Sequence, residues 1–274
     1  MLSENGRGAT VEETGMAELR GIYILWYREV LRLRRDRPRL VASLGAPLLF
    51  LVVFGFGLSR PMGTLVAGIN FTQFLFPGII GMTVLMSALM SGMSVVWERE
   101  MGFLKEVLVS PLSRRAVVLG KALGGSTLAI FQGVVLLILS PFLEVKIPLL
   151  SLLWLLLLLF LIAFALSSLG VLIASRTHTM EGFQVIMNLV IMPLVFLSGI
   201  FFPLTGLPGW LSVVVTINPL TYGVDAIRRI ILGPAVPSVV WLQHPVGLGE
   251  DILVIGLLTL IVTGLAIWSF SRQE

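Results

Sequence analysis

The sequence predicts an all-α membrane protein with six transmembrane helices, and three observations support this. Hydrophobic residues make up 57% of the 274 positions, and the mean hydropathy is +1.00. Apolar runs of about 18 or more residues recur along the chain, and each is long enough to cross the roughly 30 Å hydrocarbon core of a bilayer. The Lys and Arg residues collect in those segments that the topology below places on one side.

Composition also excludes several functional classes. The chain has no cysteine, so disulfides and thiolate chemistry are excluded. His178 and His244 stand alone in the sequence, which argues against a metal site. No phosphate-binding loop is present, because Gly120-Lys121 lacks the preceding glycine spacing and the following hydroxyl. We therefore expect no enzyme activity, no bound cofactor and no nucleic-acid partner.

The N-terminal region divides into two parts. Residues 1–16 are polar and are expected to be a disordered tail. Residues 17–37 show helical periodicity, with Trp26 on an apolar stripe and arginines, among them Arg28 and Arg32, on the other face. This pattern predicts a basic helix lying on an anionic membrane surface, with a soluble helix packed on another domain as the alternative.

Six apolar runs then follow, and we place the spans at about 40–58, 74–96, 116–140, 149–174, 183–202 and 252–270. Residues 204–232 are neither a full span nor an ordinary polar loop. The apolar run 211–217 is too short to cross the membrane, and Asn218-Pro219 interrupts it. Two short helices that enter and return on one face would accommodate this segment. Asp225 and Arg229 are spaced i, i+4 and are expected to pair.

Between the second and third spans, residues 97–111 form a charged island. Read as a helix, one side carries Trp97, Met101, Leu104 and Leu108, and Ser110-Pro111 ends it. An amphipathic helix flat on the membrane surface is one interpretation, and a solvated loop is the other. Glu100 is the exception among the charged residues, because a helical wheel places it on the apolar side.

Charge asymmetry orients this topology. With residues 1–39, the 97–115 island, Lys121, Arg176 and the C-terminus on one side, that side holds 15 of the 19 Lys and Arg. The positive-inside rule then predicts that both termini are cytoplasmic and that 204–232 lies on the extracytoplasmic side.

Three motifs resemble those of the ABC-2-type transport permeases. They are Phe76-Pro77-Gly78-Ile79; the long run Glu98–Arg114 followed by Gly120-Lys121; and Asn218-Pro219-Leu220-Thr221-Tyr222 with Asp225-Ala226-Ile227-Arg228. In order and spacing they cover nearly everything from Ala17 to Phe270. The Gly102-Phe103-Leu104-Lys105-Glu106 variant resembles the daunorubicin-resistance type of drug-efflux permease, although many relatives carry Glu where Lys105 stands.

The resemblance implies a homodimer bound to two copies of a separate ATP-binding subunit, which holds the ATP and Mg. The 17–37 helix would be the connecting helix, with Trp26, Arg28 and Arg32 as its site residues, and 97–111 would be the coupling helix seated in the ATPase. Its expected coupling residues are Glu98, Arg99, Glu100, Gly102, Phe103, Lys105, Glu106, Ser110 and Pro111.

Glu98 and Arg99 are expected to be exposed for this docking. Glu100 is expected to pair with Arg28 or Arg32, because a carboxylate on an apolar face is unfavourable unless it is paired. The alternative is that Glu100 reaches to water.

The translocation path is expected between subunits, with candidate lining residues Met82, Met86, Met90, Asn188, Met192 and Ser198. A methionine stripe suits hydrophobic ligands but also suits ordinary helix packing. The 204–232 pair would close the outer side through Asn218, Pro219, Tyr222, Asp225, Arg228 and Arg229.

We therefore expect the multi-pass permease subunit of an ATP-driven exporter in the cytoplasmic membrane of a prokaryote, surrounded by membrane lipids. Its cargo would be hydrophobic or amphipathic, such as a drug, lipid, glycolipid or polysaccharide. One alternative is a membrane scaffold or receptor for a signalling partner. An ion-coupled carrier is a weaker one, since the predicted spans hold no Asp, Glu or His.

Overall fold

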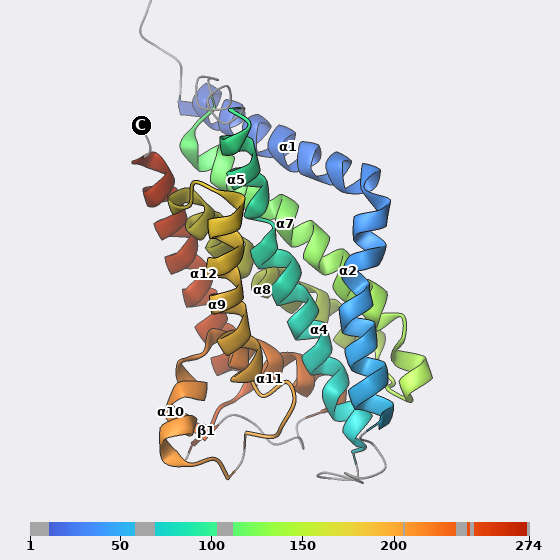
Figure 1. Cartoon of the computed structure of the whole chain (residues 1–274). Coiled ribbons are helices and arrows are strands. Elements are labelled where there is room, and N and C mark those ends of the chain that lie inside the picture. Colours follow the sequence, from blue (N-terminus) through green and yellow to red (C-terminus); the bar gives the residue numbers. More distant parts are fainter. Residues whose placement is uncertain are drawn as a thin grey trace, which may run out of the picture.

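A computed structural model describes residues 11–57, 69–102, 112–204, 206–233, 240–241 and 244–272, and almost all of this part is helical (Figure 1). The elements are α1 (Val11–Arg35), α2 (Arg37–Phe50), the π-helix η1 (Leu51–Phe56), α4 (Phe71–Met90), α5 (Met93–Glu100), α7 (Arg114–Leu137), the short 3-10 helix η2 (Ser140–Leu143), α8 (Leu149–Arg176), α9 (Met180–Phe196), α10 (Gly209–Ile217), α11 (Pro219–Leu232) and α12 (Leu248–Ser271). Two-residue strands β1 (Val240–Trp241) and β2 (His244–Pro245) form an antiparallel pair. The all-α prediction is confirmed.

The described residues contain four helical stretches that are long and apolar enough to cross a membrane. These are α7, α8, α12 and the stretch Phe71–Glu100, which contains α4 and α5. Two bent pairs qualify if each counts as one span: α1 with α2 and η1, bent by 75°, and α10 with α11, bent by 84°. Helix α9 is apolar but has only 17 residues. The structure thus has four to six candidate spans, and the exact layout of six remains a prediction.

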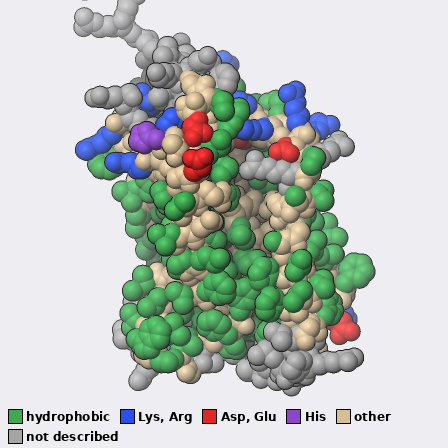
Figure 2. All heavy atoms as spheres, in the orientation of Figure 1, with side chains coloured by type: hydrophobic (Ala, Val, Ile, Leu, Met, Phe, Trp, Pro, Cys, Tyr) green, Lys and Arg blue, Asp and Glu red, His purple; other side chains and the backbone are tan. Residues whose placement is uncertain are grey.

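The two ends of the molecule differ in composition. Helix α1 lies across one end, which also holds the C-terminal end of α12, whereas α10 and α11 lie at the opposite end (Figure 1). Charged side chains gather at the α1 end, and hydrophobic side chains cover most of the rest of the visible face (Figure 2). This is the separation of charge that the positive-inside argument assumed.

Helix α4 is the centre of the packing, and it contacts α7, α8, α9 and α11. In its most apolar window 67% of residues are buried, compared with 28% for α12, although α12 has the higher hydropathy of the two. This difference is expected in a membrane, where lipid-facing positions are as apolar as the core. Hydropathy therefore located the helices but did not indicate which of them is central.

Helix α1 packs closely on α7 because glycines leave room for it. A Cβ atom at Gly120 would lie 2.6 Å from Cβ of Leu25, and one at Gly124 would lie 2.5 Å from Cβ of Glu29. Gly120 and Gly124 are spaced four residues apart, a spacing of small residues that allows close contact between helices. The glycines thereby fix the face of α1 that turns toward the bundle.

Two sequence expectations are corrected by the observed helix ends. Residues 11–16, expected in a disordered tail, already belong to α1, and Val-Glu-Glu-Thr contains no helix breaker. Helix α5 stops at Glu100, and Gly102 has a φ of +78°, a left-handed conformation that commonly ends helices. Trp97 therefore lies in the last turn of the long second helix instead of starting a new one, and residues 103–111 lie outside the described residues.

The segment between α9 and α12 begins and ends at the same end of the molecule (Figure 1). The side-chain oxygen of Asn218 accepts a hydrogen bond from the N–H of Leu220 at 3.0 Å, which caps α11, and its Nδ2 donates to the carbonyl of Leu194 at 2.9 Å. Pro219 occupies the first turn, where its missing N–H costs nothing. This arrangement suits the predicted re-entrant pair, although a broken span has the same helices.

Candidate functional site

Three consecutive residues at the end of α5 each contact a different neighbouring element. Glu98 turns toward α1 and α7, Arg99 toward the C-terminal end of α8, and Glu100 toward the N-terminal end of α9. They immediately precede residues 103–111, the segment expected to dock on a partner. We therefore take this end of α5, together with its partners, as the candidate functional site.

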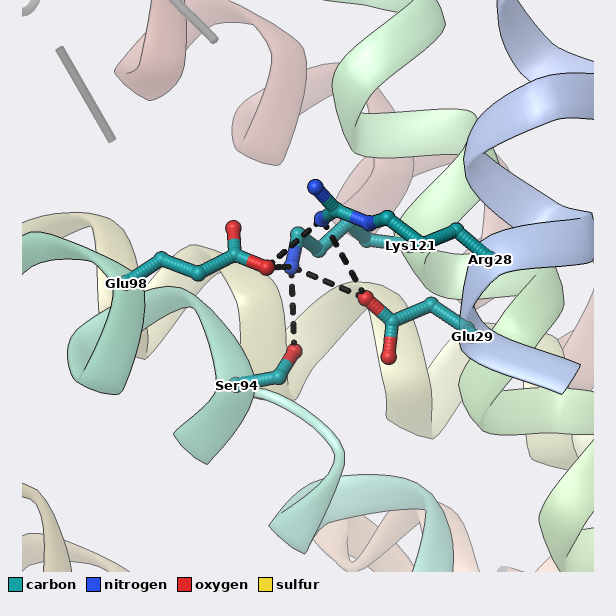
Figure 3. A network of polar contacts seen from close by, with 5 residues as sticks. All are labelled: Arg28, Glu29, Ser94, Glu98 and Lys121. Atoms are coloured by element: carbon teal, nitrogen blue, oxygen red, sulfur yellow. Dashed lines mark hydrogen bonds and ion pairs between the residues drawn. The ribbon is translucent and has the colours of Figure 1, made fainter. Parts of the chain in front are cut away.

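Glu98 lies in a charged network that joins three helices (Figure 3). Its Oε1 is 2.6 Å from a guanidinium nitrogen of Arg28 on α1 and 2.8 Å from Nζ of Lys121 on α7. Only 5% of Glu98 is exposed, so the expectation that it faces water is wrong. A buried carboxylate needs paired charge, and the network supplies it from two directions.

Lys121 is the centre of the network. Its ammonium group lies 3.0 Å from Oε1 of Glu29 and 3.2 Å from Oγ of Ser94, to which it donates hydrogen bonds, and 2.8 Å from Oε1 of Glu98, with which it forms an ion pair (Figure 3). The side chain is 2% exposed. Because these acceptors come from α1 and α5, the lysine ties both helices to α7.

Glu29 on α1 completes the balance of charge. Burial by itself would raise the pKa of its carboxyl, but the ion pair with Lys121 and the charges of Arg28 and Arg32 outweigh burial, and the pKa is lowered. Arg28 also lies 3.6 Å from Glu29. Two acids and two bases therefore compensate one another across the three helices.

Arg99 holds the end of α8. Its guanidinium donates to the carbonyl oxygens of Ala174 at 3.1 Å, of Ser175 at 3.2 Å and of Thr177. The last carbonyls of a helix have no partner within the helix, and a cation there is also favoured by the helix dipole. The side chain is therefore not the exposed docking group that the sequence suggested, but a link between α5 and α8.

Glu100 is exposed, and its Oε1 accepts a hydrogen bond from the N–H of Met180 at 2.9 Å. Met180 is the first residue of α9, where an N–H is free and negative charge is favoured. The expected pair with Arg28 or Arg32 is not formed, and Glu98 takes Arg28 instead. The helical wheel failed because it assumed a helix continuing through Gly102.

The other expected residues of α1 also contact the bundle. Nε1 of Trp26 donates to Oγ1 of Thr127 on α7 at 2.9 Å, and the guanidinium carbon of Arg32 lies 4.8 Å from the ring centroid of Trp97. Tyr23, in contrast, remains 57% exposed. One face of α1 is thus bound to α5 and α7, and the other is free for the membrane surface.

A second charged group lies at the opposite end of the molecule. Nε of Arg229 is 3.0 Å from Oδ2 of Asp225, so the predicted i, i+4 pair is confirmed, and Arg229 also donates to the carbonyl of Val246. Arg228 donates to the carbonyl of Gly199 at 2.8 Å and lies over the ring of Phe74 at 4.0 Å. Asp251 of α12, which the sequence analysis did not single out, lies 3.9 Å from Arg229 and is fully buried.

Tyr222, the last of the expected gate residues, forms a local contact. Its hydroxyl donates to the carbonyl of Thr216 at 2.8 Å.

The residues expected to line the translocation path do not form one surface within the chain. Met82 and Ser198 are buried, Met86 and Met90 line a cavity, and Asn188 and Met192 lie on the exposed face of α9.

Comparison with known proteins identifies the family of this chain. A profile of the family described as ABC-2 type transporter matches residues 20–232, which include all three motifs. The chain belongs to this family. Among its relatives, the putative transport permease ycf38 of Cyanophora paradoxa is 30% identical over 76% of this chain and 72% of its own length.

Two bacterial relatives bear more specific names. The probable multidrug ABC transporter permease YbhR of Escherichia coli K12 is 30% identical over 63% of this chain and 47% of its own length. Nodulation protein J of Rhizobium leguminosarum bv. trifolii is 29% identical over 79% of this chain and 80% of its own length. This ABC-2 permease is thus a multi-pass transport subunit of an ABC transporter, and the family implies association with an ABC ATP-binding subunit.

In this permease the expected coupling residues divide into two sets. Glu98, Arg99 and Glu100 bind neighbouring helices, and Gly102 ends their helix. Phe103, Lys105, Glu106, Ser110 and Pro111 lie outside the described residues, as does the rest of 103–111.

Glu29 and Lys121 were missed as site residues. The signals were present, since Glu29 is an acid within a strongly basic helix and Lys121 is the one charge inside an otherwise apolar run. Neither signal names its partner, because the partner lies on a distant part of the chain.

Proposed function

We propose that this permease is the membrane-spanning subunit of an ATP-driven exporter in the cytoplasmic membrane of a prokaryote. It works as a homodimer with both termini in the cytoplasm, and it moves a hydrophobic or amphipathic substrate outward. Two copies of a separate subunit bind ATP and Mg and supply the energy, because this chain carries no phosphate-binding loop. The name of one relative, a probable multidrug permease, supports this class of cargo.

The observation that carries the proposal is the three-way connection at the end of α5. A displacement of the segment after Gly102 acts directly on Glu98, Arg99 and Glu100, and through them on α1, α7, α8 and α9. Packed helices move as units, so a small shift at this point is carried along whole spans. Energy from a partner would thus reach the bundle without chemistry in this chain.

The test is transport by proteoliposomes that contain the permease with its co-purified ABC ATP-binding subunit. We expect ATP-dependent flux of a hydrophobic fluorescent drug or a labelled lipid. In Arg99→Gln, which loses the link to α8, we expect ATP hydrolysis to persist while flux falls. Arg115→Gln is the matched control, because Arg115 is exposed.

Two outcomes would contradict the proposal. Flux by the permease alone, driven by an ion gradient, would favour the ion-coupled carrier. ATP hydrolysis by the complex with no flux of any tested substrate would favour the scaffold or receptor. Equal flux in Arg99→Gln and wild type would remove the proposed route of coupling.

A further inference from the structure

A cavity of about 590 Å³ lies within the single chain, between α2 and α4, and it is bounded by α1, α5 and α7. Its volume is in the range of sites that bind small molecules. On α2 the wall is made by Leu40 and by four smaller residues, Ala42, Ser43, Ala46 and Pro47. Met86 on α4 remains 37% exposed, so the cavity is open to the surroundings of the bundle.

The wall on α4 and α5 carries two parallel stripes. One is made of hydroxyl residues and the other of methionines, and both repeat every three or four positions: Thr83, Ser87, Ser91 and Ser94 in the first, and Met86, Met90 and Met93 in the second. Methionine adapts to flexible apolar ligands such as an acyl chain. The sequence showed the methionine stripe, but only the fold shows that it faces an open space.

The polarity of the cavity changes along its length. At the α1 end lie Glu29, Arg32, Asp36 and Lys121 beside Trp97, whereas Pro47, Thr83, Met86 and Leu128 lie toward the other end. Lys121 and Gln132, both on α7, mark its two ends and are eleven residues apart, or about 16 Å at 1.5 Å per residue. This is about half of the roughly 30 Å hydrocarbon core, the depth of one leaflet.

The charged end favours an anion. Glu29 is balanced by Lys121, and Arg28 by Glu98, as described above. Arg32 also acts on Glu29 and lies over Trp97, and with Arg35 it lines a second hollow that shares Arg32 and Asp36 with the cavity. Among these residues, the four bases Arg28, Arg32, Arg35 and Lys121 outnumber the three acids Glu29, Asp36 and Glu98. Arg32 and Arg35 are both exposed, and guanidinium groups bind phosphate oxygens in pairs.

One polar atom within the wall lacks a partner. Oγ of Ser87 is buried and has no hydrogen-bond partner among the described residues, whereas Thr83 and Ser91 bond backbone carbonyls of their own helix. An unsatisfied buried hydroxyl costs free energy, so a polar ligand atom that reaches it would relieve that cost. Midway along the cavity, such an atom would be the ester carbonyl that joins a head group to its chain.

We propose that this cavity binds an anionic amphiphile from the adjacent leaflet, with its phosphate at Arg32 and Arg35 and one acyl chain along the methionines, and that such molecules are the cargo. The cargo assignment rests on the proposed export function, but the binding site does not. The ester group would accept a hydrogen bond from Ser87. The site lies inside one subunit and needs no second copy to form.

The test uses the full-length permease in nanodiscs and lysophosphatidylglycerol with a photoreactive group near the end of its chain. We expect covalent adducts on peptides around Ala46 and Met86, located by mass spectrometry. Lysophosphatidylcholine with the same chain should give about fivefold less adduct, as expected for a partly exposed charge pair. Arg32→Gln with Arg35→Gln should remove this preference but leave the adducts in place.

Variants that fill the cavity separate the site from general contact with lipid. Ala46→Phe, and independently Ala42→Phe one turn away, should each lower adduct yield by about tenfold or more, since added bulk fills the space for the chain. Val41→Phe is the matched control, because Val41 is exposed on the same helix and does not line the cavity. Elution as a single peak in size-exclusion chromatography shows whether each variant is folded.

The proposal is wrong if the folded filling variants label like wild type, if adducts fall equally on α8 and α12, or if the two probes label alike. The same probe then separates the two proposals in proteoliposomes. Binding without ATP-dependent flux refutes the export function alone. ATP-dependent flux that is unchanged in Ala46→Phe refutes the cargo site alone.

Discussion

The two charged groups of this permease use the same residue types in different ways. At the α1 end, each ion pair of Lys121 and Glu98 joins separate helices, and Arg28 remains 44% exposed. At the opposite end, Asp225 and Arg229 pair within α11. There Arg228 also donates to the carbonyl of Gly199, and Arg229 donates to that of Val246. The first network consists mainly of pairs between helices, whereas the second combines one pair within α11 with contacts of Arg228 and Arg229 to neighbouring segments.

This difference indicates which end can move. Interhelical pairs are lost when one helix shifts, so the α1 end reports the position of α5, whereas the pair of Asp225 and Arg229 persists while α11 stays folded. We therefore regard the α1 end as the part that responds to a partner and the α11 end as a fixed closure. The predictions below test this contrast.

The largest effect is expected for Lys121→Met. The substitution leaves Glu29 and Glu98 buried without their shared cation, and breaking a buried ion pair commonly costs about 3–5 kcal/mol. Thermal unfolding of the detergent-solubilised protein measures the loss. Lys146→Met is the control, since Lys146 is exposed, and an equal effect of the two substitutions would show that the network is not stabilising.

A smaller loss is expected for Asp225→Leu. It removes the charged hydrogen bond from Arg229, which is worth about 1.5–3 kcal/mol. Asp251→Leu should cost less, because the described residues give the Asp251 oxygens no hydrogen bond. Denaturation midpoints of the two variants compare them, and a larger loss for Asp251→Leu would show that Arg229 depends more on Asp251 than on Asp225.

A double-mutant cycle sharpens the difference between Glu98 and Glu100. Arg28 with Glu98 should show a coupling energy of about 0.5–1 kcal/mol, a modest value because Arg28 is partly exposed. Arg28 with Glu100 should show none, since Glu100 bonds Met180. Coupling of Arg28 to Glu100 instead would restore the pairing suggested by the helical wheel.

The smallest effect concerns pH. The pKa of Glu29 is lowered in the folded protein, so its contribution to stability is present above the ordinary value of 4.5 and is lost as pH falls through the folded value. The stability difference between wild type and Glu29→Gln should therefore shrink as the pH is lowered from 7 toward and below 4.5. Melting temperatures across this range measure it, and a constant difference would mean that Glu29 is not held ionised by Lys121.

Much of the fold could be predicted from the sequence, because it depends on local physics. Hydrophobic runs located the membrane helices, periodicity located α1, and the i, i+4 spacing identified the pair of Asp225 and Arg229. Motif order was enough to identify the ABC-2 type family. Apart from the order of the motifs, each of these signals lies within a few residues or repeats along one element.

Only the tertiary structure decided which acid meets which base. Glu98 and Glu100 lie two positions apart, about 200° around a helix, so the turn at Gly102 and the packing of α5 determined which of them faces Lys121. The partners Glu29, Glu98 and Lys121 come from three helices, and no local pattern encodes their meeting. The cavity also depends on the tertiary structure, because residues of α2, α4 and α7 that are distant in the sequence line it together.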